Sequence, residues 1–90
     1  MEDQLHQIVE LLQDLIRIDS TNPPGNEDRI AGFIAEYLAE AGIDCQLVRL
    51  EEGRSSVVGM IPGKGRGNIA LCGHIDTVRV KEERWSYLPF

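Results

Sequence analysis

The sequence predicts an α/β fold in which two helices pack on a sheet of at least three strands. Two stretches in the first half repeat apolar residues every three or four positions, as one face of a helix requires. Of two later stretches, the first has the two-residue alternation of a strand and the second is rich in β-branched residues. A short continuous apolar run follows them. The order helix, helix, strand, strand, strand is typical of a layered domain, and 90 residues suffice for one domain at most.

The first helix is expected over residues 3–18. Its apolar face consists of Leu5, Ile8, Val9, Leu12, Leu15 and Ile16. Residues 19–25 end the helix, because this segment gathers turn formers and two prolines that lack backbone donors. We therefore expect residues 19–25 to form a loop.

The second helix is expected over residues 27–41. Asn26 can cap its N-terminus, and Glu27 and Asp28 suit a first turn where the helix dipole favours carboxylates. Gly42 suits the left-handed position just after a helix end. The apolar face repeats at Ile30, Phe33, Ile34, Tyr37, Leu38 and Ala41.

Three strands are expected after Gly42. Residues 45–50 alternate, residues 55–61 gather β-branched side chains, and residues 51–54 form the turn between them. The glycine-rich residues 62–67 lack the spacing of a phosphate-binding loop and are expected to form a second hairpin turn. Residues 68–73 are a continuous apolar run of the kind found in a buried central strand, which places His74 at the end of that strand.

The charge pattern argues against a nucleic-acid partner. There are 9 Lys and Arg against 15 Asp and Glu, a net charge of −6, and the basic residues are scattered along the chain. Neither an apolar run of about 20 residues nor a signal peptide is visible in the sequence, so we expect a cytoplasmic protein without a membrane partner.

The two cysteines are expected to be reduced and buried. Cys45 and Cys72 lack the C-x-x-C spacing of a zinc knuckle or redox pair. Cys72 lies two positions before His74, so both side chains would point to the same face of a strand, and Cys72 is a candidate second metal ligand. A thiol in such an apolar run is, however, more often a small core side chain. We favour the core interpretation of Cys72.

His74 and Asp76 are the candidate site residues. If an extended chain continues through them, their side chains lie on the same face and can touch. A metal-bound imidazole usually donates its second ring N–H to a carboxylate, so the pair suits zinc. The alternative is a hydrogen-bonded structural histidine without a metal.

Three ordered motifs resemble a known family. They are Asp19-Ser20-Thr21-Asn22-Pro23-Pro24-Gly25-Asn26-Glu27, Gly73-His74-Ile75-Asp76-Thr77-Val78 and Trp85-Ser86-Tyr87-Leu88-Pro89-Phe90. Together they are similar to the opening motifs of the M20 metallopeptidases, the zinc-dependent amidohydrolases and peptidases that include deacetylases, desuccinylases, aminoacylases and some carboxypeptidases.

The resemblance implies a hydrolase that cleaves the amide bond of an N-acyl amino acid or a small peptide. His74 would be a zinc ligand, and Asp76 would be the catalytic carboxylate that orients this ligand and tunes the metal-bound water. One or two zinc ions are implied, with cobalt or manganese as substitutes. Trp85 and Phe90 would line the wall beside the site, although apolar residues that cover a sheet edge explain both equally well.

The resemblance also implies that residues 1–90 are the N-terminal portion of such a zinc-peptidase-like catalytic domain, without its lid and dimerisation domain. The family's other ligands and its general base lie further along the chain, and neither His6, on an exposed helix face, nor Glu51 and Glu52, in a turn, replaces them. We expect the isolated chain to be inactive. Two alternatives are a non-catalytic binding or regulatory module and a self-assembling chain in which several copies of His74 share one metal.

Overall fold

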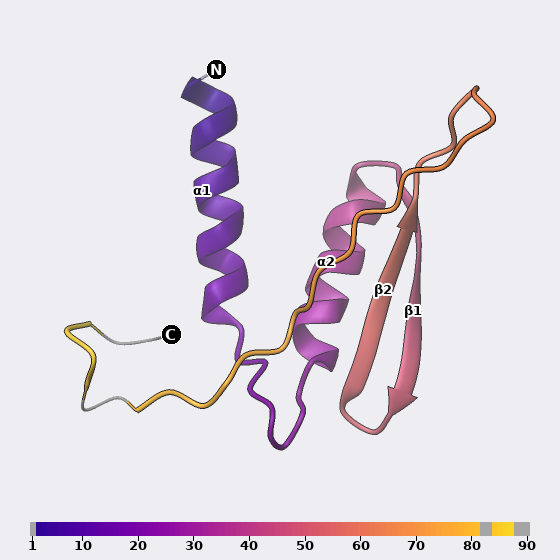
Figure 1. The fold of residues 1–90 in the computed structure, drawn as a ribbon. Coiled ribbons are helices and arrows are strands. Elements are labelled where there is room, and N and C mark those ends of the chain that lie inside the picture. Colours follow the sequence, from indigo (N-terminus) through magenta and orange to yellow (C-terminus); the bar gives the residue numbers. More distant parts are fainter. Residues whose placement is uncertain (1, 82–83, 88–90) are drawn as a thin grey trace.

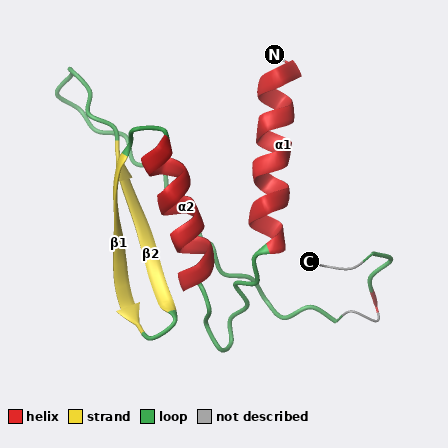
Figure 2. Ribbon diagram, turned by 180° about the vertical axis from the view of Figure 1, so that it is seen from behind, coloured by secondary structure: helices red, strands yellow, loops and turns green. Residues whose placement is uncertain are grey.

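The computed structural model describes residues 2–81 and 84–87 of the chain. Its elements follow in the order α1, α2, β1, β2. In Figure 1, α2 lies against the two strands, whereas α1 stands apart and the segment after β2 runs back toward the end of α1. The view from behind in Figure 2 shows the same separation of α1 from the strands. The predicted α/β class is thus confirmed for two helices and a two-stranded antiparallel sheet.

Helix α1 spans Glu2–Arg17, within one residue of the predicted range. Glu2 and Asp3 lie in its first turn and Arg17 in its last, which complements the helix dipole at both ends. None of its described residues is buried. The prediction that both helices cover the sheet is wrong for α1, because α2 alone packs extensively on the strands. Periodicity reveals an apolar face but does not reveal which surface covers it.

Helix α2 spans Asp28–Glu40. The predicted cap by Asn26 is wrong: the N-cap position is Glu27, without a side-chain cap hydrogen bond. The Asn26 side chain is used elsewhere, since its Nδ2 donates to the Asp19 carbonyl oxygen at 3.4 Å. Gly42 follows the helix with φ +79°, the left-handed conformation predicted for it.

Strands β1 (Asp44–Glu51) and β2 (Arg54–Met60) form the predicted antiparallel hairpin. Gly53 has φ +80°, which lets the chain reverse between them. Cys45 pairs with Gly59, where α2 approaches closely: a Cβ on Gly59 would lie 3.2 Å from Cδ1 of Leu38. The missing side chain of Gly59 thus permits close packing of helix on sheet.

The predicted third strand is not formed within the described residues. Residues 68–73 belong to no strand, and Ile69 and Leu71 are 92% and 95% exposed. The second hairpin expected at residues 62–67 is therefore also wrong. A strand requires a neighbour for its backbone hydrogen bonds, and an apolar run in the sequence cannot supply that neighbour.

The buried residues gather at the start of α2. Among the residues that the structure describes, Ile30 and Ala31 are the buried apolar side chains, and Ser20 and Glu27 are the buried polar ones. Both polar residues belong to the loop that joins the helices or border it. The best-packed part of the described chain is therefore the place where this loop meets the hairpin and residues 74–77. None of the described helices is long and apolar enough to cross a membrane.

We predict that the isolated chain self-associates through residues 68–73, because an exposed extended segment with apolar side chains readily pairs with other chains. Ile69→Lys with Leu71→Lys should lower the weight-average mass measured by sedimentation. Gly65→Lys with Gly67→Lys adds the same charge at positions with no atom within 4 Å of the new Cβ, so it should leave the mass unchanged. A wild-type chain that sediments as a sharp monomer would contradict the prediction.

Candidate functional site

A short backbone bridge joins two of the sequence motifs. Thr21 and Thr77 form an isolated parallel bridge. The Asn22 N–H donates to the Thr77 carbonyl oxygen at 2.8 Å, and the Thr77 N–H donates to the Ser20 carbonyl oxygen at 3.1 Å. Ser20 is only 1% exposed, so one side of this bridge is shielded from water. The bridge brings the loop between the helices to the segment that carries His74 and Asp76.

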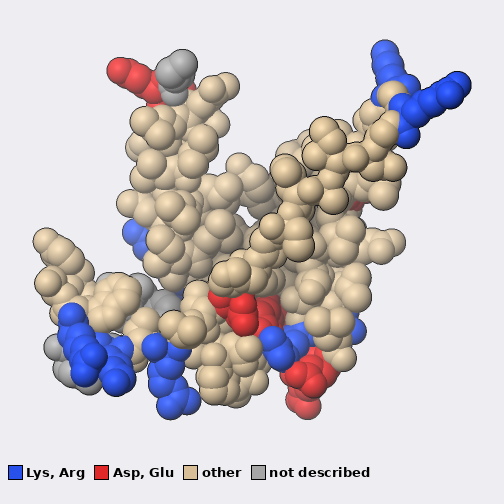
Figure 3. All heavy atoms as spheres, viewed as in Figure 1, with Lys and Arg blue, Asp and Glu red and all other residues tan. Residues whose placement is uncertain are grey.

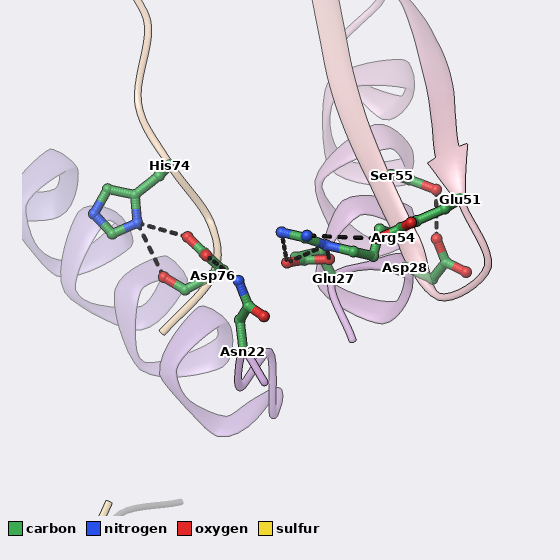
Figure 4. Close-up of polar contacts among 8 residues, drawn as sticks. All are labelled: Asn22, Glu27, Asp28, Glu51, Arg54, Ser55, His74 and Asp76. Carbon is green, nitrogen blue, oxygen red and sulfur yellow. Dashed lines mark hydrogen bonds and ion pairs between the residues drawn. The ribbon is translucent and has the colours of Figure 1, made fainter. Parts of the chain in front are cut away.

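His74, Asp76 and Asn22 form a continuous chain of side-chain contacts at this bridge (Figure 4). Nδ1 of His74 lies 3.1 Å from Oδ1 of Asp76 and 2.9 Å from its carbonyl oxygen. Nδ2 of Asn22 donates to Oδ2 of the same carboxylate at 3.1 Å. The contact expected between His74 and Asp76 is present, and Asn22 is a partner that sequence reasoning missed, since no spacing pattern links position 22 to position 76.

The surroundings of Asp76 favour its charged form. The hydrogen bond from Asn22 lowers the pKa of this carboxyl below 3.8, the contacts with His74 lower it further, and partial burial opposes both. An ionised Asp76 accepts hydrogen bonds with both oxygens. If the His74 ring is neutral, it must then carry its proton on Nδ1, which leaves the lone pair of Nε2 free.

These residues fit one zinc ligand and its supporting carboxylate. Nδ1 of His74 faces Asp76, so Nε2 is the ring nitrogen that remains for a metal. The His74 side chain is 85% exposed and is therefore accessible. Within residues 2–81 and 84–87, however, no three His, Cys, Asp or Glu side chains are grouped so as to hold a metal ion. The described chain thus presents one donor with its orienting partner and does not complete a zinc site.

Two expectations about neighbouring residues are wrong. His74 does not end a buried strand, and Cys72 is an exposed free thiol, because residues 68–73 have no covering layer. Cys45 is half-buried, and its thiol lies 3.4 Å from the carbonyl oxygen of Ala35 in α2. The core interpretation of Cys72 therefore fails, whereas Cys45 packs between helix and sheet.

A second polar group lies beside the first and was not predicted. Glu27 is 4% exposed and accepts hydrogen bonds from Nε of Arg54 at 3.2 and 3.1 Å and from Nη2 at 3.0 Å. The Glu27 carboxylate raises the pKa of the Arg54 guanidinium through these hydrogen bonds and its charge. Figure 3 shows acidic and basic atoms side by side at the lower centre of this face. No periodic pattern links positions 27 and 54, so the sequence carries no signal for the pair.

The Glu27–Arg54 pair fixes the loop against the hairpin. Gly25 has φ +87°, and a Cβ there would lie 2.8 Å from Cδ of Arg54. The Asp28 N–H donates to the Gly53 carbonyl oxygen at 3.1 Å, and the Ser55 hydroxyl donates to the Asp28 carboxylate. An open hollow of about 240 Å³ separates this group from His74, and both groups contribute to its lining.

The other candidates lie as follows. The side chain of His6 is 73% exposed on α1 and lies 3.1 Å from Glu10, which confirms the expected solvent-facing histidine. Trp85 is 53% exposed and borders an apolar groove of about 500 Å³ between the two helices and residues 74–80. Phe90, the other proposed wall residue, lies outside the described residues.

Sequence comparison identifies relatives of the chain. It is 34% identical over 92 residues to the acetylornithine deacetylase of Vibrio atlanticus (strain LGP32) and 30% identical over 91 residues to that of Vibrio campbellii (strain ATCC BAA-1116). Each alignment covers 96% of this chain and 24% of the relative. The chain is a homologue of acetylornithine deacetylases. The predicted resemblance to the M20 family is thereby confirmed.

The acetylornithine deacetylase of Vibrio cholerae (strain ATCC 39541) is 35% identical over 65 residues, which is 72% of this chain and 17% of the relative. The chain thus spans about a quarter of the length of the first two acetylornithine deacetylases. No family model and no solved structure matches it.

We predict that Gly25→Ala destabilises the chain. Alanine at φ +87° is strained and its Cβ would collide with Arg54, so the free energy of unfolding should fall by about 1–3 kcal/mol in urea titrations. Gly32→Ala is the matched control, since a Cβ there meets nothing within 4 Å in α2, and it should raise stability by about 0.5–1 kcal/mol. Equal effects of the two substitutions would contradict the close contact at Gly25.

We predict that Thr21→Val raises the pKa of Asp19. The Thr21 hydroxyl and its backbone N–H, at 3.0 Å, hydrogen-bond Oδ1 of Asp19 and hold its pKa below 3.8. Such a carboxylate stabilises the fold above pH 3.8, and this contribution is lost as the pH falls through the lowered pKa. Carboxyl NMR titration should show the rise, and the variant should lose less stability than wild type in acid. Thr77→Val, at the other side of the bridge, should leave the Asp19 titration unchanged.

Proposed function

We propose that the chain belongs to a zinc-dependent hydrolase of amide bonds and supplies one metal ligand to its site. The contact between His74 and the ionised Asp76 is the observation that supports this proposal most directly. Such a carboxylate–imidazole pair is the usual support of a zinc-bound histidine. The names of the relatives add a reaction class, because a deacetylase is a hydrolase that removes an acetyl group from an amide.

In this proposal Asp76 works through His74. Its Oδ1 accepts a hydrogen bond from Nδ1–H, which fixes the ring orientation, and its negative charge makes Nε2 a stronger metal ligand. Nε2 of His74 would hold zinc, or cobalt or manganese in its place. Bound there, the metal would supply Lewis-acid polarisation of the scissile carbonyl and a water of lowered pKa.

The proposed substrate class is a small N-acyl amino acid, with a short peptide as the alternative within the same chemistry. The relatives' name supports the N-acyl amino acid, because acetylornithine carries an acetyl group on an amino acid. The open hollow beside His74 is also lined by Arg54, and it gives a small polar molecule access to the His74 side chain. We propose that the chain alone is inactive, since one imidazole with its carboxylate cannot complete a zinc site.

Segment exchange tests this function. In the acetylornithine deacetylase of Vibrio atlanticus, the matching segment is replaced by this chain, and hydrolysis of N-acetylornithine is measured. We predict an active chimera in which Asp76→Asn lowers kcat/KM about 10- to 100-fold and His74→Ala lowers it further. His6→Ala, at the other histidine, should leave the rate unchanged. Full activity of the His74→Ala chimera would remove the proposed role of this residue.

Zinc calorimetry on the isolated chain is the companion measurement. We expect only the weak affinity of separate exposed imidazoles, to which His74 and His6 both contribute, so His74→Ala and His6→Ala should each reduce it in part. Tight binding that depends on His74, together with a mass in light scattering that rises when zinc is added, would instead show that several copies of the chain share one metal.

A further inference from the structure

Asn22 holds the second oxygen of the carboxylate that supports His74. Oδ1 of Asp76 faces Nδ1 of His74, and Oδ2 accepts from Nδ2 of Asn22 at 3.1 Å. A carboxylate held by one donor can still rotate about its terminal bond, whereas one held at both oxygens has a fixed plane. The plane of Asp76 in turn decides whether Oδ1 faces the His74 ring.

The chemical type of the donor also matters. An amide orients the carboxylate without neutralising it, so the charge of Asp76 remains available to the N–H of His74. The nearby Arg54 could otherwise pair with Asp76, whose negative charge is a minor cause of the raised pKa of the Arg54 guanidinium. Its guanidinium is instead engaged by Glu27 at 3.0 Å and lies near Glu51 at 3.6 Å (Figure 4). The two polar groups thus remain separate, and Asp76 is left to Asn22 and His74.

The backbone places Asn22 independently of its side chain. Its N–H donates to the Thr77 carbonyl oxygen at 2.8 Å, directly beside Asp76 in the sequence. Asn22 and Asp76 are both half-buried, whereas His74 is exposed. The Asn22 amide therefore lies on the protected side of the carboxylate, and His74 faces solvent.

We propose that Asn22 is a positioning residue for the metal ligand: through Asp76 it selects the tautomer of His74 that leaves Nε2 free. The inference rests on the proposed function for its relevance to a metal. Its structural content is independent of any metal, because the tautomer of His74 is a property of the chain itself.

The test is the tautomer ratio of His74 in the metal-free full chain, measured from the ring ¹⁵N chemical shifts above the titration range of imidazole, about pH 8. Wild type should favour the Nδ1–H form. Asn22→Leu, which has similar size and no donor, should free the Asp76 carboxylate to turn away from the His74 ring and lower the ratio of Nδ1–H to Nε2–H about tenfold, the effect of losing the charge-assisted hydrogen bond between Nδ1 and Oδ1. The Nδ1–H form is not abolished, because the backbone carbonyl oxygen of Asp76, 2.9 Å from Nδ1, still accepts from it. Asn26→Leu is the matched control from the same loop, since its amide donates to Asp19 and not to Asp76.

Amide exchange separates positioning from a merely structural role. If Asn22 acts through its side chain, the Thr77 N–H stays protected in Asn22→Leu while the tautomer ratio falls. An unchanged ratio, or a change that appears only together with lost protection of Thr77, overturns the inference. Asn22→Ala gives a second reading should the leucine variant fold poorly, because it removes the donor without adding charge or bulk and should shift the ratio in the same direction.

The same variant in the chimera connects this inference to function. Asn22→Leu should lower kcat/KM for N-acetylornithine about 10-fold, and Asn26→Leu should not. Failure of the proposed function would appear as an inactive chimera that carries the unmodified chain. Failure of the positioning inference would appear as an unchanged His74 tautomer ratio in Asn22→Leu, whether or not the chimera is active.

Discussion

The arrangement of this site depends on the backbone bridge between Thr21 and Thr77. Two hydrogen bonds of 2.8 and 3.1 Å tie the loop after α1 to the segment that carries His74 and Asp76. Residues 68–73 have no strand partner, so nothing else in regular secondary structure fixes that segment among the described residues. Without the bridge, Asn22 and Asp76 would be distant residues on two independent loops.

A second constraint holds the loop from the other side. The buried Glu27 carboxylate binds the Arg54 guanidinium, and the Asp28 N–H binds the carbonyl oxygen of Gly53 at 3.1 Å. The loop between the helices is therefore fixed to the hairpin at one end and to residues 74–77 at the other. This double attachment explains why buried polar residues, Ser20 and Glu27, lie at the loop and not within the sheet: each is hydrogen-bonded through its backbone or side chain.

The donor atoms available to a metal explain why the proposal assigns this chain a single metal ligand. His74 offers one accessible nitrogen, supported by a carboxylate whose second oxygen is also held. The exposed apolar faces of α1 and of residues 68–73 match the limited burial in the described chain, where Ile30 and Ala31 form the apolar core. A site that needs several ligands and an enclosing wall requires more surfaces than these elements provide.

Sequence alone was sufficient to predict both helices, the hairpin, the left-handed conformation of Gly42 and the contact between His74 and Asp76, because each depends on residues close together in the chain. It also determined the family resemblance through ordered motifs. The distant contacts are visible only in the folded chain: Asn22 pairs with Asp76, Arg54 pairs with Glu27, and residues 68–73 have no strand neighbour in the described part of the chain. Asn22 and Asp76 are separated by 54 positions in the sequence, and Glu27 and Arg54 by 27. Local periodicity carries no information on which distant segments will meet.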